Sequence, residues 1–337
     1  MSNKKFKAAV IGLHMGKRHL DAVIENGSEL AAICDTNPEV LKTIAEEYKI
    51  PEEKCYTDWH ELLNIPGLDI VIVATPDQLH REMSEVFLAA GVHVMCEKPL
   101  ALIKEDLDAI VRASDKSKAK FMVGQICRFT PAFVKAKELI DNGTIGDVYF
   151  VESEYAHDYA RILHEWRADP NRHGVIGGGC HAVDLLRWFV GDPEEVFAYG
   201  SHKLLPQVTY DDATISVLKF PNGVIGKVFV STGCKRTYTM RTLVYGTKGT
   251  IICDNTSDYM TLFTVSENGV SLNKPETIPI KVDNHNTIGE YAVFADHIAN
   301  DTPVTMDARQ GAKTVAACMA IVESAKTGKT VVPNYEF

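Results

Sequence analysis

The 337-residue sequence has no apolar run near the ~18 residues that a membrane-spanning helix needs. Its basic start, residues 4–7, leads into a short apolar stretch that resembles a signal peptide only weakly, and we interpret residues 7–13 as a first β-strand. The formal net charge of −10 lacks the positive excess of proteins that bind nucleic acid or anionic membranes. We therefore expect no nucleic-acid and no membrane partner. A phosphate-bearing cofactor is not excluded, because backbone N–H groups can bind phosphate.

The eight cysteines are scattered singly, with no C-x-x-C pair and no tight cluster with histidine. This pattern excludes a zinc knuckle and a disulfide scaffold, and it favours reduced thiols in a cytoplasmic protein. His157, His164, His173 and His181 lack a ligand-like spacing, so we expect no metal site.

Internal repeats and low-complexity linkers are also missing. Hydrophobic residues make up 45% and charged residues 24%, which is typical of a globular protein. The length exceeds one ordinary core, and we predict two domains, residues 1–124 and 125–337.

The first domain alternates predicted strands and helices. We expect strands at 7–13, 30–34, 69–74, 93–96 and 121–124, with helices at 16–26, from Pro38, and at 78–90 and 104–118. The nearly unbroken β-branched segment 69–74 indicates a strand buried on both faces. Alternation of this kind predicts an α/β fold in which a doubly wound, parallel Rossmann sheet carries helices on both faces.

Sheets of this type bind ligands outside the carboxyl ends of their strands. The candidate cofactor-binding residues are therefore those at or near these ends: Gly12, His14, Met15, Gly16, Asp35, Thr75, Pro76, His80, Glu97, Lys98 and Gln125.

The first turn, Gly12–Gly16, is a shortened glycine loop with His14 where a second glycine would stand in G-x-G-x-x-G. Asp35 ends the next strand, where a carboxylate can accept both ribose hydroxyls of NAD and repel the 2′-phosphate of NADP. The alternative for Asp35 is a turn residue that caps the Pro38 helix. NAD is the predicted cofactor, and NADP stays open because Lys17 and Arg18 lie near the loop.

The second domain is predicted to be α+β, with an open, mainly antiparallel sheet. Strands are expected at 147–155, 214–220, 224–231, 239–245 and 250–253, with helices at 181–190 and 288–300. A last helix, about 308–326, can pack back on the first domain. The free face of an open sheet would leave apolar surface exposed, so we expect a homodimer or homotetramer through this sheet.

Several short motifs follow one another along the chain in a characteristic order. They are the glycine loop with His19, Ala74-Thr75-Pro76 with His80, GVHVMCEKPL at 91–100, RFTP at 128–131, GTIGDV at 143–148, WRADP at 166–170, GCHAVD at 179–184 and YGTKG at 245–249. As an ordered set they resemble the glucose–fructose oxidoreductase, inositol dehydrogenase and MocA family over nearly the whole chain.

The resemblance implies an NAD-dependent oxidoreductase acting on a secondary hydroxyl or the matching ketone of a sugar, polyol or related cyclic compound. It implies that Lys98 lies beside the nicotinamide, where a surface lysine before a turn is the alternative. His181, whose residue type suits proton exchange near neutrality, is the second catalytic candidate, and Asp184 one turn later could orient its ring or bind substrate. The alternative is that both residues serve only the helix N-terminus.

The sequence departs from the family pattern at one place. Gly177 stands four residues before His181, where the family usually has a catalytic Asp, and Asn171-Arg172-His173 replaces an upstream triple glycine. A group from elsewhere could fill this gap, and the candidates are Tyr155, His157, Asp158, Tyr159 and His164. We expect Tyr155, His157, Trp166, Arg167 and Asp184 to bind substrate, although Arg167 could instead pair with Asp169 or Glu165.

Two other functions stay open at this level. Tightly held NAD could be recycled within each turnover, which would give epimerisation or glycoside cleavage. Alternatively the chain could be a non-catalytic NAD-binding regulatory protein, which Gly177 favours but Lys98 and His181 oppose.

Overall fold

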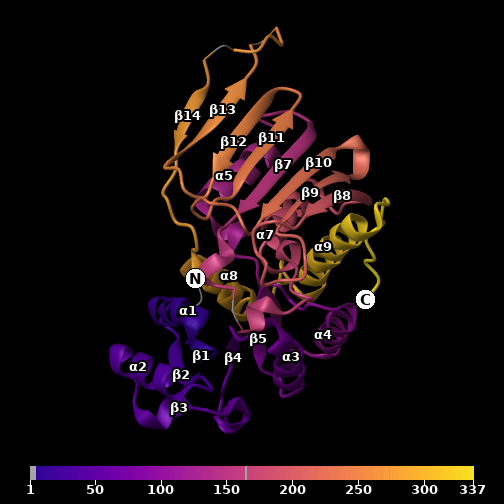
Figure 1. Cartoon of the computed structure of the whole chain (residues 1–337). Helices are drawn as coiled ribbons and strands as arrows, with labels where there is room; N and C mark the ends of the chain where they lie inside the picture. The colour runs from indigo at the N-terminus through magenta and orange to yellow at the C-terminus, as the bar shows by residue number, and fades with distance from the viewer. Residues whose placement is uncertain (1–4, 164, 267, 273) are drawn as a thin grey trace. The chain divides into compact units, whose positions relative to one another are not determined.

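The structure is a computed structural model that describes residues 5–163, 165–266, 268–272 and 274–337 (Figure 1). The chain forms two compact units. Unit 1 holds Met1–Gln125, Asn286–Ala312 and Phe337, and unit 2 holds Ile126–His285 and Lys313–Glu336. The units therefore differ from the two continuous stretches expected from the sequence, because a late segment groups with unit 1.

Unit 1 is built on a six-stranded parallel sheet in the order β3-β2-β1-β4-β5-β6. The strands are β1 (Lys7–Ile11), β2 (Glu29–Cys34), β3 (Cys55–Tyr56), β4 (Ile70–Val73), β5 (His93–Glu97) and β6 (Phe121–Gly124). All four residues of β4 are buried, as its β-branched sequence indicated. The predicted doubly wound parallel sheet is confirmed.

Helices follow the strands of unit 1 in the expected alternation. They are α1 (Leu13–Glu25), α2 (Pro38–Tyr48), α3 (His80–Ala89) and α4 (Lys104–Lys116), with short 3-10 helices η1 (Glu52–Lys54), η2 (Trp59–Asn64) and η3 (Asp77–Leu79). Asn37 caps α2 through its side chain, and Pro38 occupies the first turn, where its missing N–H costs nothing.

A helix from late in the sequence, α8 (Thr287–Ala299), completes unit 1. It packs on α1, and the hydroxyl of Tyr291 donates a hydrogen bond to Ser28 Oγ at 2.8 Å. The Thr287 hydroxyl donates to the Arg18 carbonyl at 3.1 Å. Burial of Tyr291 and Phe294, both fully inaccessible, ties this helix to the unit.

Unit 2 is built on an eight-stranded sheet in the order β14-β13-β12-β11-β7-β10-β9-β8 (Figure 1). β7 and β10 pair in parallel and the other described pairs are antiparallel, which confirms the mainly antiparallel prediction. The strands are β7 (Val148–Ala156), β8 (Glu195–Ser201), β9 (Ala213–Lys219), β10 (Ile225–Ser231), β11 (Arg241–Gly246), β12 (Gly249–Asp254), β13 (Tyr259–Thr264) and β14 (Glu276–Pro279).

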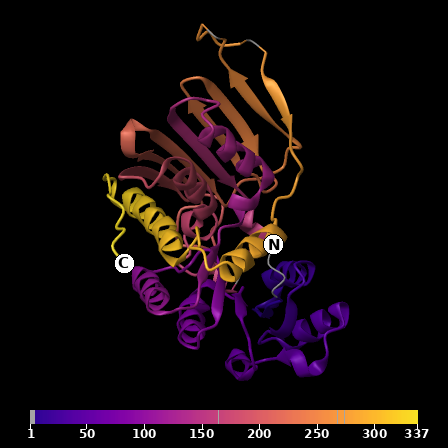
Figure 2. The same cartoon turned by 180° about the vertical axis from the view of Figure 1, so that it is seen from behind.

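The helices of unit 2 lie against one face of this sheet. α5 packs on β12 and α7 on β7, and the view from behind shows α5 in front of the strands (Figure 2). The helices and 3-10 helices are α5 (Pro131–Asp141), α6 (Gly174–Gly177), α7 (Cys180–Val190), η4 (Ile126–Phe129), η5 (Tyr159–Arg161), η6 (Glu165–Ala168) and η7 (Pro221–Gly223).

The last helix, α9 (Ala308–Thr327), is divided between the units. Its first turn belongs to unit 1, where Gly311 has no room for a side chain because a Cβ would lie 2.5 Å from Val123 Cγ2. From Lys313 onward the helix belongs to unit 2, where Ser324 Oγ accepts a hydrogen bond from the Ala198 N–H at 2.9 Å.

Within the described residues, no helix is both long enough and apolar enough to cross a membrane. In the part of the chain that the structure describes, none of the eight cysteines forms a disulfide.

Candidate functional site

The glycine turn between β1 and α1 requires glycine at its first position. Gly12 has φ 85°, and a Cβ there would lie 2.5 Å from the Ala74 carbonyl oxygen. A Cβ on Gly16 would lie 2.8 Å from Val10 Cγ1, so the second glycine lets α1 pack closely on β1. His14 and Met15 lie between them and are exposed. The turn thus lacks side chains where the backbone packs closely and is exposed between the two glycines. A dinucleotide pyrophosphate binds to a turn of this kind.

Asp35, directly after β2, bonds to this turn. Its Oδ2 accepts the Leu13 N–H at 2.8 Å and its Oδ1 accepts the Asn37 N–H at 2.9 Å. The cap of α2 is Asn37 and not Asp35. A carboxylate has about four acceptor positions, so Asp35 retains capacity for ribose hydroxyls.

Thr75 and Pro76 follow β4 and are half-buried. His80 is different, because it is fully buried and each ring nitrogen faces a backbone carbonyl. Nδ1 lies 3.0 Å from the Pro99 oxygen and Nε2 lies 3.2 Å from the Thr75 oxygen. The ring of His80 is therefore used by the backbone on both sides, whereas we expected it to contact the cofactor.

Glu97 ends β5 and begins the Glu97-Lys98-Pro99 segment, in which the Lys98–Pro99 peptide bond is cis. Glu97 Oε1 lies 2.8 Å from His19 Nε2, and Oε2 accepts the Lys98 N–H at 3.1 Å. Burial opposes ionisation of Glu97, but His19 and the Lys98 charge and N–H outweigh it and lower the pKa to about 2. Lys98 is half-buried, and within the described part of the chain its amine makes no hydrogen bond.

Two buried polar side chains near Glu97 have no hydrogen-bond partner among the described residues. Gln125 follows β6, whose Gly124 is paired with Glu97, and both polar atoms of its amide are unbonded. Glu290 on α8 is 0% exposed, and both its carboxyl oxygens are unbonded. Burial, with a smaller contribution from the Glu97 charge, raises the pKa of Glu290 well above its usual value. Glu290 was not among the predicted site residues, because α8 lies far along the chain from β5.

In unit 2, His181 lies in the first turn of α7 among aromatic side chains. Its ring stacks on Tyr155 with centroids 6.2 Å apart. The Tyr155 hydroxyl lies 2.9 Å from the Tyr159 hydroxyl and 3.2 Å from His157 Nδ1. Tyr238, which we did not predict, packs on Tyr155 at 5.4 Å. Burial, followed by the neighbouring Tyr159 and Tyr238, raises the pKa of Tyr155, so this phenol stays neutral.

The turn before His181 is occupied by side chains from elsewhere in unit 2. A Cβ on Gly177 would lie 2.4 Å from Arg172 Nη1, and a Cβ on Gly178 would lie 2.3 Å from the Tyr159 hydroxyl. The buried guanidinium of Arg172 thus lies against the position where the family usually has an Asp. Arg172 also lies over the Trp166 ring at 4.9 Å.

The remaining predicted residues of this region have other contacts. Arg167 stacks over Trp166 at 4.3 Å, and both residues are half-buried in η6. Asp158 is a cap for η5 and pairs with Lys235 at 3.2 Å, which leaves it outside the aromatic cluster. His164 lies outside the described residues.

Asp184 corrects a sequence expectation. It is 1% exposed and accepts two hydrogen bonds from Arg128, at 2.7 and 2.8 Å, and one from the Thr314 hydroxyl at 2.8 Å. A carboxylate so fully bonded and buried is not available to substrate, so we assign it to the framework of unit 2. This pairing could not be predicted from the sequence, because Arg128 lies in η4, 56 residues before Asp184.

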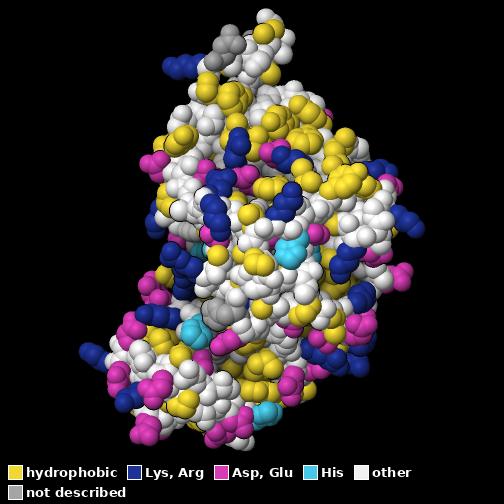
Figure 3. Space-filling model, in the orientation of Figure 1, with side chains coloured by type: hydrophobic (Ala, Val, Ile, Leu, Met, Phe, Trp, Pro, Cys, Tyr) yellow, Lys and Arg dark blue, Asp and Glu magenta, His cyan; other side chains and the backbone are white. Residues whose placement is uncertain are grey.

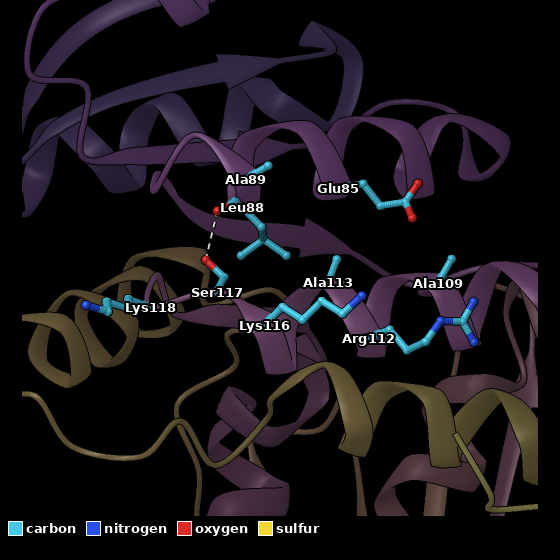
Figure 4. A pocket seen from close by; sticks show the side chains of 9 residues that line it. All are labelled: Glu85, Leu88, Ala89, Ala109, Arg112, Ala113, Lys116, Ser117 and Lys118. Carbon is cyan, nitrogen blue, oxygen red and sulfur yellow. Dashed lines mark hydrogen bonds between the residues drawn. The ribbon is translucent and has the colours of Figure 1, made fainter.

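A shallow hollow of about 400 Å³ lies between α3 and α4 in unit 1 (Figure 4). Leu88 and Ala113 line its floor, and Glu85, Arg112 and Lys116 lie around it. None of the candidate cofactor residues lines it, so we do not assign it to the site. Among the described residues, no cluster of three or more His, Cys, Asp or Glu side chains could hold a metal ion.

A parallel sheet, a glycine turn bonded to an aspartate, and a lysine directly after an inner strand are together the features of an NAD-dependent oxidoreductase of the Rossmann class. The chain belongs to the glucose–fructose oxidoreductase, inositol dehydrogenase and MocA family. Residues 6–125 match the family's "Oxidoreductase family, NAD-binding Rossmann fold", and residues 133–252 match its C-terminal domain. The resemblance and the NAD prediction are thereby confirmed.

Named relatives support this assignment. The chain is 31% identical over 271 residues to myo-inositol 2-dehydrogenase of Thermotoga maritima, covering 77% of this chain and 78% of the relative. Among solved structures, levoglucosan dehydrogenase in complex with NADH and levoglucosan superposes with a TM-score of 0.89 at 25% identity, covering 99% of this chain and 100% of that one. Aldose-aldose oxidoreductase from Caulobacter crescentus, complexed with glycerol, gives 0.85 at 26% identity, covering 98% and 100%.

Proposed function

We propose that this oxidoreductase transfers a hydride between NAD and a secondary hydroxyl, or the matching ketone, of a sugar, polyol or related cyclic compound. The observation that carries the proposal is the position of Lys98, half-buried directly after β5, at the edge of unit 1 that also bears Gly12 and Asp35. The names of the relatives, which are inositol and levoglucosan dehydrogenases, support the substrate class.

The residues of unit 1 fit NAD. The turn at Gly12 would be filled by any Cβ, and Asp35 faces the same turn with acceptor capacity to spare. We propose that Gly12, His14, Met15 and Gly16 hold the pyrophosphate, that Asp35 binds the ribose, and that Thr75, Pro76 and Gln125 contact the nicotinamide half. Bound NAD supplies the hydride acceptor or donor.

Oxidation of a carbinol moves a hydride to NAD and a proton to a side chain. We propose that the Lys98 amine hydrogen-bonds the reacting oxygen and takes part in this proton transfer. In unit 2 we propose His181 as a second acid–base group, because a histidine exchanges protons near neutrality. The hydroxyls of Tyr155 and Tyr159 and the ring of His157 can supply hydrogen bonds that suit a polyhydroxy compound. We propose Trp166 and Arg167 as further substrate contacts.

The test is a panel of inositols, aldoses and anhydrosugars incubated with NAD and followed by NADH absorbance. We expect NADH to form with at least one compound. Lys98→Met should lose turnover while retaining NADH binding, since methionine preserves the length of the side chain without its amine. Absence of any product across the panel, measured by chromatography as well as absorbance, would overturn the proposal.

The aldose-aldose oxidoreductase relative favours a second candidate, in which NAD stays bound and is recycled within each turnover. Two sugars can exchange a hydride through one bound NAD with no net change of the cofactor. The same panel separates the candidates, because a new sugar product without accumulated NADH would identify recycling.

We also propose that the chain forms a homodimer or homotetramer through the face of the unit 2 sheet opposite α5 and α7. Its support is exposed apolar surface on neighbouring strands, with Tyr199 67% exposed, Val217 52% and Ile225 49%. Apolar side chains gather over these strands in the space-filling view (Figure 3). In sedimentation, Val217→Glu should dissociate the oligomer and the loop control Val270→Glu should not. We further propose a cytoplasmic location, which the scattered cysteines of the sequence, without any C-x-x-C pair, support.

A further inference from the structure

The Glu97-Lys98-Pro99 segment is bonded at both ends by buried histidines. His19 from α1 contacts the Glu97 carboxylate at 2.8 Å, and His80 from α3 contacts the Pro99 carbonyl at 3.0 Å. Their exposed fractions are 1% and 0%, so neither ring is open to solvent or to a ligand at the surface. Lys98, between the two contacts, carries the amine to which we assign proton transfer.

His80 needs a proton on both ring nitrogens. Nδ1 and Nε2 each face a backbone carbonyl oxygen, and a carbonyl can only accept a hydrogen bond. A neutral imidazole has only one N–H, so its other ring nitrogen would be a hydrogen-bond acceptor that faces a carbonyl oxygen, which is also an acceptor. Burial disfavours the charged ring, but Cys96 on β5, Asp77 on η3 and the Thr75 carbonyl outweigh it and raise the pKa of His80 to about 9. Both carbonyl contacts are satisfied together only when the ring is an imidazolium, which then joins the turn after β4 to the turn after β5.

His19 acts on the other end through Glu97. One carboxylate oxygen binds His19, and the second accepts the Lys98 N–H at 3.1 Å, so the chain of contacts ends on the Lys98 backbone itself. The Glu97 side chain is 12% exposed, and it is ionised at neutral pH. A carboxylate bonded at both oxygens has little freedom to rotate, and this fixes the direction of the Lys98 N–H.

We propose that His19 and His80 are positioning residues for the reaction, which hold the backbone of Lys98 from its two sides so that the amine meets the reacting oxygen. The proposal rests on the proposed role of Lys98. Misplacement of a catalytic group by about 1 Å can cost roughly 100-fold in rate, so a small shift of this segment has a large effect.

Isosteric amides separate the contacts of each histidine. The side-chain nitrogen of Asn lies at the position of Nδ1 in His, and that of Gln lies at the position of Nε2. His80→Asn therefore keeps the donor to Pro99 and loses the one to Thr75, whereas His80→Gln does the opposite. For His19 the order reverses, because the contact to Glu97 uses Nε2.

The experiment measures kcat and KM for these four variants on the best substrate of the panel. We expect His80→Asn and His19→Gln to stay within about 3-fold of the native kcat, and His80→Gln and His19→Asn to lose roughly 10- to 100-fold, with KM for NAD nearly unchanged. If the two amides at each position behave alike, or if the loss follows melting temperature alone, the histidines are structural and the proposal fails.

Two further measurements complete the test. His93→Gln changes a histidine at the amino end of the same strand, where Nδ1 accepts the Lys120 N–H at 2.8 Å, and it should leave kcat unchanged. Nitrogen NMR of histidine-labelled, cofactor-free protein should show both nitrogens of His80 protonated at pH 7.5, and a neutral ring would overturn the proposal. Wild-type turnover in Lys98→Met would instead refute the proposed function, which keeps the two failures distinct.

Discussion

The Asp35 carboxylate accepts the backbone N–H of Leu13 at 2.8 Å, so the end of β2 is fastened to the first residue of α1. This contact places a negative charge beside the glycine turn. At this position a carboxylate would favour a free ribose hydroxyl and oppose a 2′-phosphate.

Asp35→Ser should therefore relax the preference for NAD over NADP. We expect the ratio of kcat/KM values for the two cofactors to fall roughly 10- to 100-fold, since charge-assisted hydrogen bonds contribute about 1.5–3 kcal/mol. The matched control is Asn37→Ala, which removes the α2 cap and should cost about 1 kcal/mol of stability without changing the ratio. An unchanged ratio in Asp35→Ser would reduce Asp35 to a structural turn residue.

His181→Asn should lower kcat by roughly 100- to 10,000-fold, the range for loss of a general acid or base. The variant keeps a polar group in the first turn of α7, so its melting temperature should change little. Tyr155→Phe is the comparison, because it keeps the stacked ring but removes the hydroxyl that bonds Tyr159 and His157. A pH–rate profile measures both variants, and a native profile in His181→Asn would remove this residue from proton transfer.

Asp184→Asn should destabilise the protein by about 3–5 kcal/mol, because it leaves the Arg128 guanidinium buried without its carboxylate. Denaturant titration measures the loss. The double variant Asp184→Leu with Arg128→Met should recover part of it, since it removes both charges. A stable Asp184→Asn with a raised substrate KM would contradict our assignment and restore Asp184 to substrate binding.

Glu290→Gln should stabilise the protein at neutral pH. Burial raises the pKa of Glu290 above its usual 4.5, so the folded state keeps a proton that the unfolded state releases. The native protein therefore loses stability as pH rises above about 4.5, and the variant is spared this loss.

The gain from Glu290→Gln should be near zero at pH 4 and about 1–3 kcal/mol at pH 7. Denaturation at several pH values tests it, with the exposed Glu82→Gln on α3 as the control. A gain that does not depend on pH would show that Glu290 is ionised in the folded protein.

Local pattern determined most of unit 1. The β-branched run of β4 requires burial on both faces, and Gly12 is required by a positive φ and a carbonyl 2.5 Å from its missing Cβ. These are properties of a few neighbouring residues, so they can be read from the sequence. The same holds for Lys98, whose place follows from the end of a predicted strand.

Among the elements of unit 2 that were not predicted, one has a clear sequence pattern and another has a weak pattern. α5 has apolar residues at helical spacing, Ala132, Phe133, Ala136 and Leu139, and could have been predicted. β14 is largely exposed and carries little alternation, so only its pairing with β13 defines it as a strand.

Tertiary structure alone decided which polar groups meet. The sequence places Asp184 one turn after His181, but Arg128 and Thr314, which are far away in the chain, donate hydrogen bonds to its carboxylate. They do so because a buried charge must be paired. The sequence also places His80 near a cofactor loop, but burial turned both ring nitrogens toward carbonyls. Sequence spacing fixes backbone periodicity and strand ends, whereas the partner of a buried charge depends on packing between segments that no local pattern specifies.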